Sequence, residues 1–146
     1  MSRRSQILVG SFLLWTVFVW GLVRVRNILG DDEISTATRN WSLLLSATLW
    51  LPAVVLLVAL GLAVVRRRPL PGAARLGVAL LGVWTTLVWL VRGADIALTS
   101  EEGAAFIAVH LVLAIVSVGL AVLAARSLRT PDPTPVGADA LRTYSR

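Results

Sequence analysis

The stretch from Trp41 to Val65 reads WSLLLSATLWLPAVVLLVALGLAVV and is followed directly by three arginines. A helix needs about 20 predominantly apolar residues to cross the hydrocarbon core of a bilayer. This stretch meets that length without a charged side chain. Pro52 is tolerable within it, because neighbouring groups in a spanning helix satisfy the carbonyl that a proline leaves free. The stretch therefore predicts a transmembrane helix.

Three further apolar runs extend over Ile7–Val23, Leu76–Val91 and Ala104–Ala125. Hydrophobic residues make up 57% of the 146 residues and charged residues 15%, whereas soluble domains average about 45–50% and about 25%. The sequence predicts an all-α, polytopic membrane protein. Its four transmembrane helices are expected at about 5–29, 41–65, 75–98 and 104–126.

The four predicted helices form one transmembrane domain over 1–129. Beyond Arg129 the chain reads TPDPTPVGADALRTYSR, in which prolines are frequent and large apolar side chains few. Such a composition cannot bury enough apolar surface to fold. We predict a disordered cytoplasmic tail over 130–146.

The distribution of arginine predicts the orientation, because cytoplasmic loops of membrane proteins carry the excess of basic residues. One set of helix ends and tails holds Arg3, Arg4, Arg66, Arg67, Arg68, Arg75, Arg126, Arg129, Arg142 and Arg146. The other set holds only Arg24, Arg26, Arg39 and Arg92, together with six acidic residues. Both termini and the loop over 66–75 are therefore predicted to be cytoplasmic, with the loops over 30–40 and 99–103 outside.

These features predict a multi-pass protein of the cell membrane. The absence of lysine beside abundant Ala, Val, Leu and Gly is typical of a GC-rich bacterium. The basic loop, Arg66-Arg67-Arg68 with Arg75, predicts contact with anionic lipids at the cytoplasmic face, worth about 1 kcal/mol per residue. Because the arginines flank apolar runs, the net charge of +6 does not indicate a nucleic-acid partner.

Two segments of the chain match. Trp15–Arg24 reads WTVFVWGLVR, and Trp84–Arg92 reads WTTLVWLVR, one residue shorter. Beyond each arginine, Asn27-Ile28 corresponds to Asp95-Ile96. Because tryptophan, threonine and arginine recur in order, we predict two repeated helical hairpins, over 1–68 and 75–129. An even number of helices per copy relates such copies by a pseudo-twofold axis along the membrane normal.

A weaker match joins the second helices of the two hairpins, since Gly61–Val64 and Gly119–Val122 both read GLAV. Residues 15–32 read WTVFVWGLVRVRNILGDD. This segment resembles the first helix of small uncharacterised integral membrane proteins of actinobacteria. The resemblance covers one helix and the start of a loop. It implies a bacterial source and no particular activity.

Residues three or four apart lie on one helix face. Two polar stripes, here named the Trp/Arg stripes, result: Trp20, Arg24 and Asn27 in the first hairpin, and Trp89, Arg92 and Asp95 in the second. An ionisable residue inside a membrane marks a candidate functional site, although tryptophans and arginines also anchor ordinary helix ends. Both stripes and the single histidine, His110, form the candidate polar site. Trp15 and Trp84 lie on other faces, where we expect packing or lipid contact.

No catalytic residue, metal site or cofactor is predicted. The chain has no cysteine, and a lone histidine without acids on its own helix is a poor metal site. For His110 we expect a hydrogen-bonded packing role. A helical bundle with short loops offers no domain for soluble chemistry, so we do not expect an enzyme.

Two hypotheses for function follow. The first is a non-enzymatic accessory or scaffolding subunit that self-associates as a homo-oligomer or docks on a larger membrane complex. The second is a small transporter or channel whose outward-facing site, formed by the candidate polar site, takes an anion or an acidic lipid headgroup. Stripes that face lipid or a partner favour the first hypothesis, and stripes around an internal cavity favour the second.

Overall fold

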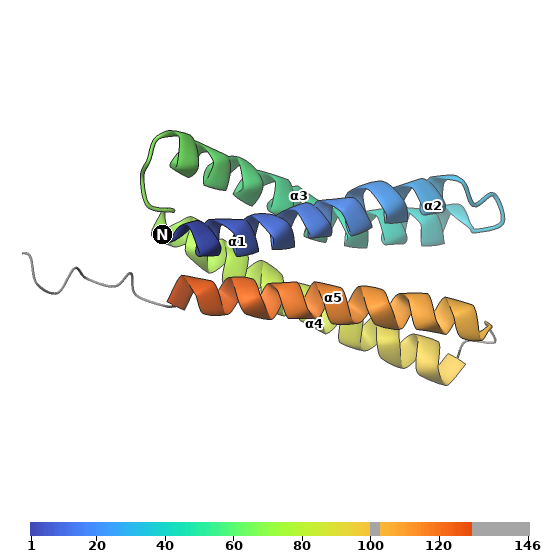
Figure 1. Cartoon of the computed structure of the whole chain (residues 1–146). Coiled ribbons are helices and arrows are strands. Elements are labelled where there is room, and N and C mark those ends of the chain that lie inside the picture. The colour runs from blue at the N-terminus through green and yellow to red at the C-terminus, as the bar shows by residue number, and fades with distance from the viewer. Residues whose placement is uncertain (100–102, 130–146) are drawn as a thin grey trace, which may run out of the picture.

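The computed structural model describes residues 1–99 and 103–129, and all regular structure within them is helical. Four helices there are long and apolar enough to cross a membrane: Arg3–Leu29, Thr36–Val65, Gly72–Ile96 and Ala104–Arg129 (Figure 1). The predicted all-α fold with four such helices is confirmed. The tail over 130–146, predicted to be disordered, lies outside the described residues.

The first long helix has three parts: α1 (Arg3–Thr16), η1 (Val17–Arg24) and α2 (Val25–Leu29). The middle part is a π-helix. A π-turn takes up one extra residue without breaking the helix. The longer of the two matching segments has its extra residue between Trp20 and Arg24, inside this π-helix.

The helix α3 (Thr36–Val65) begins before the predicted position 41 because Ser35 caps it. The Ser35 side chain accepts a hydrogen bond from the Thr38 amide at 3.2 Å, which satisfies one of the free donors at the helix start. At the other end the Arg68 amide donates to Ala63 O at 2.9 Å, and Arg67 adopts a left-handed φ of 50°. This turn reverses the chain into α4 (Gly72–Thr99), which α5 (Ala104–Arg129) follows.

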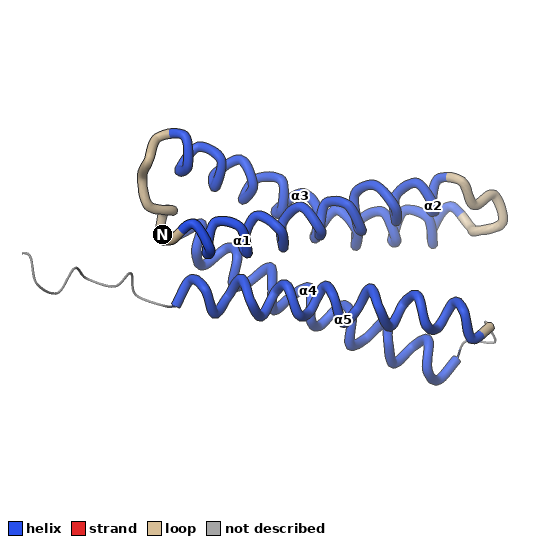
Figure 2. Tube along the Cα trace, in the orientation of Figure 1, coloured by secondary structure: helices blue, strands red, loops and turns tan. Residues whose placement is uncertain are grey.

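The helices occupy the four corners of a bundle. The helix α1 packs against α3 and α5, and α4 packs against the same two helices, so α1 and α4 stand at opposite corners (Figure 2). The N-terminus, the α3–α4 link and the end of α5 lie at one end of the bundle, here named the inner end after the predicted orientation. The α2–α3 and α4–α5 links lie at the opposite, outer end.

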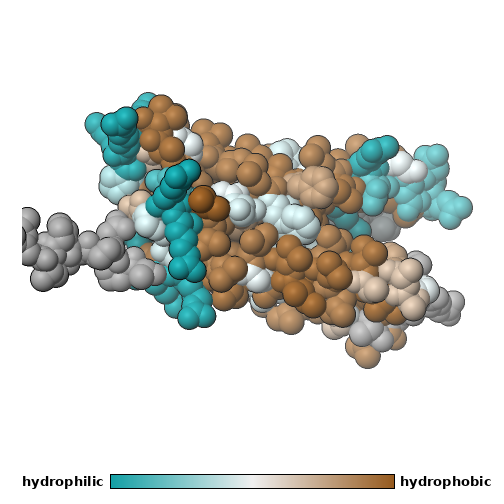
Figure 3. Space-filling view, viewed as in Figure 1, coloured by the Kyte–Doolittle hydropathy of each residue, from teal (hydrophilic) through white to brown (hydrophobic). Residues whose placement is uncertain are grey.

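The inner half of the bundle holds its most tightly packed side chains. Several side chains in this half and near the middle of the bundle have no exposed surface, namely Val9, Phe12, Leu13, Leu49 and Ala53. Around this core the surface is apolar over the length of the helices, and hydrophilic residues collect at both ends (Figure 3). Such a surface suits helices surrounded by hydrocarbon.

Hydrogen bonds between described residues join the first hairpin, made of α1, η1, α2 and α3, to the second, made of α4 and α5. Ser5 Oγ donates to Ser127 O at 3.1 Å near the inner end. Near the middle of the bundle, Trp15 Nε1 donates to Ser117 Oγ at 2.9 Å, and Trp84 Nε1 donates to Thr48 Oγ1 at 3.0 Å. Beyond this level the two hairpins diverge toward the outer end (Figure 1).

Candidate functional site

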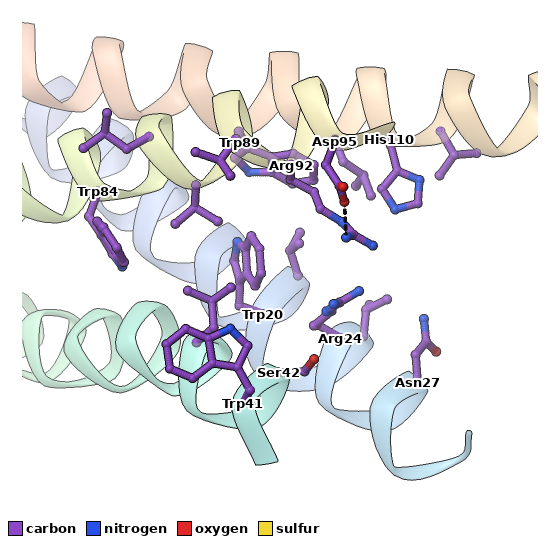
Figure 4. Close-up of a pocket in the computed structure, with 18 residues that line it drawn as sticks. Trp20, Arg24, Asn27, Trp41, Ser42, Trp84, Trp89, Arg92, Asp95 and His110 are labelled. Carbon is purple, nitrogen blue, oxygen red and sulfur yellow. Dashed lines mark hydrogen bonds and ion pairs between the residues drawn. The ribbon is translucent and has the colours of Figure 1, made fainter. Parts of the chain in front are cut away.

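A pocket of about 610 Å³ lies between the hairpins in the outer half of the bundle (Figure 4). All four long helices contribute to its wall. The structure brings every residue of the candidate polar site to this pocket: Trp20, Arg24, Asn27, Trp89, Arg92, Asp95 and His110. The two Trp/Arg stripes therefore face each other across a cavity, and they do not point away from the bundle.

Trp20 and Trp89 meet at the deep end of the pocket. Their ring centroids are 5.8 Å apart at an interplanar angle of 62°, an edge-to-face arrangement that aromatic pairs favour. Both residues are buried, with 6% and 5% exposed surface. Neither indole N–H has a hydrogen-bond partner among the described residues. A buried donor without a partner costs about 1–3 kcal/mol, and both indole nitrogens are themselves buried.

The guanidinium groups of Arg24 and Arg92 point into the space between the hairpins (Figure 4). The charge of Arg92 acts on Arg24 across this space. Arg92 Nη1 lies 2.8 Å from Asp95 Oδ2, one turn along α4. The first stripe has neutral Asn27 in the position of Asp95, and Arg24 Nε is buried without a hydrogen-bond partner among the described residues. Arg92 therefore has an acidic neighbour on its own stripe, whereas Arg24 has the neutral Asn27 in that position.

His110 lies on α5 at the wall of the pocket. Its Nδ1 is 2.9 Å from the Phe106 carbonyl oxygen, and the two rings lie 4.0 Å apart. Because a carbonyl can only accept, Nδ1 carries the proton in this contact. This leaves Nε2 as the remaining polar atom of the ring.

Besides the aliphatic wall, sequence reasoning missed three aromatic or polar side chains of the pocket, namely Trp41, Ser42 and Trp84. Trp41 and Ser42 begin the second apolar run, where a tryptophan is ordinary at a membrane interface. Trp84 recurs in the repeat, but it was expected to contact lipid or to pack. In the structure, Trp84 and its counterpart Trp15 each donate a hydrogen bond to the other hairpin.

The four arginines of the basic loop lie apart from the pocket. Arg66, Arg67, Arg68 and Arg75 are exposed at the inner end. Arg75 Nη2 also donates to Leu128 O, so this arginine ties α4 to the end of α5.

The pocket has the chemistry of an anion site with apolar walls. Its charged side chains are Arg24, Arg92 and Asp95, which sum to one positive charge at neutral pH. The guanidinium groups of both arginines point into this cavity (Figure 4), and four tryptophans line it. Charged hydrogen bonds from arginine to an oxyanion are the strong kind.

Comparison with models of protein families, with curated proteins and with solved structures finds no match to this chain.

Proposed function

We propose that this chain is an integral membrane protein that binds an anion in the pocket between its hairpins, as the outward-facing site of a small transporter. The observation that carries the proposal is the pair of guanidinium groups facing one cavity. Arg24 and Arg92 repel each other there, and only Arg92 has an acidic neighbour, Asp95, along its own stripe. A bound anion between them removes the repulsion and compensates the excess charge.

The proposal includes a duplicated hairpin, and the burial of the first and third long helices supports it. Positions that correspond in the repeat are buried in both copies: Val9 and Val78, Phe12 and Leu81, Thr16 and Thr85, Val19 and Val88, Trp20 and Trp89, and Ile28 and Ile96. The first five pairs share one sequence separation, and the last is one residue closer. The π-helix absorbs that residue, so that both ends of the helix keep the same buried face.

Burial in the second and fourth long helices supports the same duplication with a different alignment from the GLAV match. Gly61 lies one turn before the end of α3, whereas Gly119 lies almost three turns before the end of α5. The buried residues of α3 and α5 correspond instead at a constant separation: Leu49 with Ser117, Ala53 with Ala121, and Leu60 with Leu128. The proposed duplication therefore pairs residues at equal depth in the bundle, and it does not use the GLAV match.

The closed inner half supports transport rather than scaffolding. Packed side chains and the Ser5–Ser127 hydrogen bond hold the hairpins together there, while the outer half stays hollow. Two repeated units around a central site can alternate by rocking against each other. Polar stripes that faced outward would support the scaffolding hypothesis, whereas both stripes face the cavity.

The proposed orientation places the inner end and both termini in the cytoplasm. The exposed arginines of the basic loop, at the inner end, support this orientation through the excess of cytoplasmic basic residues. They also support contact with anionic lipids of that leaflet.

The binding proposal is tested by ligand-dependent thermal stabilisation of the full chain in detergent. The probes are inorganic pyrophosphate and dioctanoyl phosphatidylglycerol, since a ligand that binds only the folded state raises the melting temperature. We expect at least one probe to raise it saturably in the wild type, and the effect to disappear in Arg24→Gln and Arg92→Gln.

Arg26→Gln is the matched control. Arg26 is an exposed arginine outside the pocket, on the same long helix as Arg24, and its replacement changes the net charge equally. It should keep the full stabilisation. The proposal fails if neither probe stabilises the wild type, or if Arg26→Gln abolishes the effect as completely as Arg24→Gln does.

A further inference from the structure

We propose that the anion is the phosphodiester of a membrane lipid with net negative charge, and that the lipid reaches the pocket sideways, between the hairpins, with its acyl chains against the apolar wall. This inference rests on the proposed function, because it names the class of anion that the same pocket takes. Three features of the pocket lead to it: its net charge, its wall and its opening.

The net charge selects a single negative charge. Among the residues that line the pocket, the charges of Arg24, Arg92 and Asp95 sum to one positive charge. A phosphodiester carries one negative charge, which balances this excess. A phosphomonoester or pyrophosphate brings two or more negative charges near the Asp95 carboxylate, which repels them.

The wall of the pocket is apolar to an extent that a free inorganic anion does not require. Eight aliphatic side chains line it beside the four tryptophans: Val19, Val23, Leu45, Leu87, Val88, Val91, Val109 and Leu113. Ligand sites place a few polar groups to orient a ligand and use apolar surface to hold the rest of it. Here the charged groups suit a headgroup, and the aliphatic wall suits hydrocarbon chains.

The pocket is continuous with the lipid-facing surface of the bundle. Val23 and Val109, from η1 and α5, line the pocket and have 39% and 56% exposed surface. Leu87 and Val91 of α4 likewise line it while remaining exposed. A cavity whose rim belongs to the membrane-facing surface admits a lipid without lifting its chains into water. The pocket lies in the outer half, where the hairpins diverge (Figure 1).

The test varies the probe and leaves the protein unchanged. The purified full chain in detergent is titrated with dioctanoyl phosphatidylglycerol, with glycerophosphoglycerol, which is the same headgroup without chains, and with zwitterionic dioctanoyl phosphatidylcholine. Native mass spectrometry counts the bound molecules. We expect one tightly bound phosphatidylglycerol, with glycerophosphoglycerol and phosphatidylcholine each at least tenfold weaker.

The arginine variants locate the binding. Arg24→Gln and Arg92→Gln should each weaken phosphatidylglycerol binding at least tenfold, while Arg26→Gln leaves it unchanged. The lipid inference is overturned, and the anion proposal left standing, by equal binding of glycerophosphoglycerol and phosphatidylglycerol. Greater thermal stabilisation by pyrophosphate than by phosphatidylglycerol has the same consequence. Equal binding of phosphatidylcholine overturns the inference as well. If no anionic probe binds in a way that depends on Arg24, both proposals fail.

Discussion

The same four long helices form both halves of this bundle, but the inner half is packed and the outer half contains a pocket. In the inner half, side chains such as Val9, Phe12 and Leu13 are completely buried. The Ser5 hydroxyl there donates a hydrogen bond to the Ser127 carbonyl oxygen of the other hairpin. In the outer half, the helices enclose a pocket that contains Arg24 and Arg92. Aliphatic and small side chains let helices approach closely, whereas two facing guanidinium groups repel and require a partner or water. Charge placement, more than hydropathy, decides where the bundle is closed.

The largest expected effect concerns which half faces the cytoplasm. The chain has no cysteine, so Ser35→Cys and Gly72→Cys each introduce a single thiol, the first at the outer end and the second at the inner end. A thiol reagent that cannot cross membranes should label Ser35→Cys in intact cells and Gly72→Cys only after permeabilisation. A Cβ at Gly72 meets no atom within 4 Å, so the substitution does not disturb the turn. The reverse labelling pattern inverts the orientation and makes the pocket cytoplasmic.

The same substitution at two places measures the difference in packing. Leu13→Ala removes a fully buried side chain of the core and should lower the free energy of unfolding by about 2 kcal/mol. This is the low end of the range for buried leucines, since in a membrane the packing loss remains but the transfer from water does not contribute. Leu113→Ala only widens an existing pocket and should cost under about 1 kcal/mol. Denaturant titration in mixed micelles compares them, and equal costs would contradict the hollow outer half.

The two tryptophan hydrogen bonds between the hairpins sharpen the comparison further. Trp15→Phe leaves the Ser117 hydroxyl, 2% exposed, without its donor, and should cost about 1 kcal/mol of stability. Trp84→Phe should cost at most about 0.5 kcal/mol, because Thr48 is exposed and its hydroxyl still donates to Leu45 O at 2.7 Å. Thermal unfolding of both variants provides the measurement. A larger loss for Trp84→Phe would show that the pocket side contributes more to holding the hairpins together.

The smallest expected effect separates the two arginines of the pocket. Arg92→Leu breaks the pair with Asp95, but the side chains are 39% and 50% exposed, so the loss of stability should be about 0.5 kcal/mol. Arg24→Leu removes a like charge that lacks an acidic neighbour along its stripe, and should leave stability unchanged or slightly higher. If Arg24→Leu destabilises more than Arg92→Leu does, then Arg24 has a partner that the pocket geometry does not show.

Much of the site could be predicted because helical periodicity is local. The spacing of Trp20, Arg24 and Asn27 places them on one helix face, and the matching spacing from Trp89 to Asp95 does the same in the second hairpin. The first set spans one residue more than the second. The π-helix takes up this extra residue, so Trp20, Arg24 and Asn27 still lie on one face. Trp41 and Ser42 could not be predicted, since nothing in their own run distinguishes a residue that faces a cavity from one that faces lipid.

The sequence by itself determined the four apolar helices, through runs long enough to cross a bilayer, and the composition of the two polar stripes. Only the tertiary structure decided that the stripes face each other and that Trp20 contacts Trp89. It also decided that Trp15 and Trp84 each donate a hydrogen bond to the other hairpin. Hydropathy reports the free energy of each residue in lipid or water and says little about which helices become neighbours. That choice depends on the fit of side chains between helices, which are distant in the chain and meet only when the bundle forms.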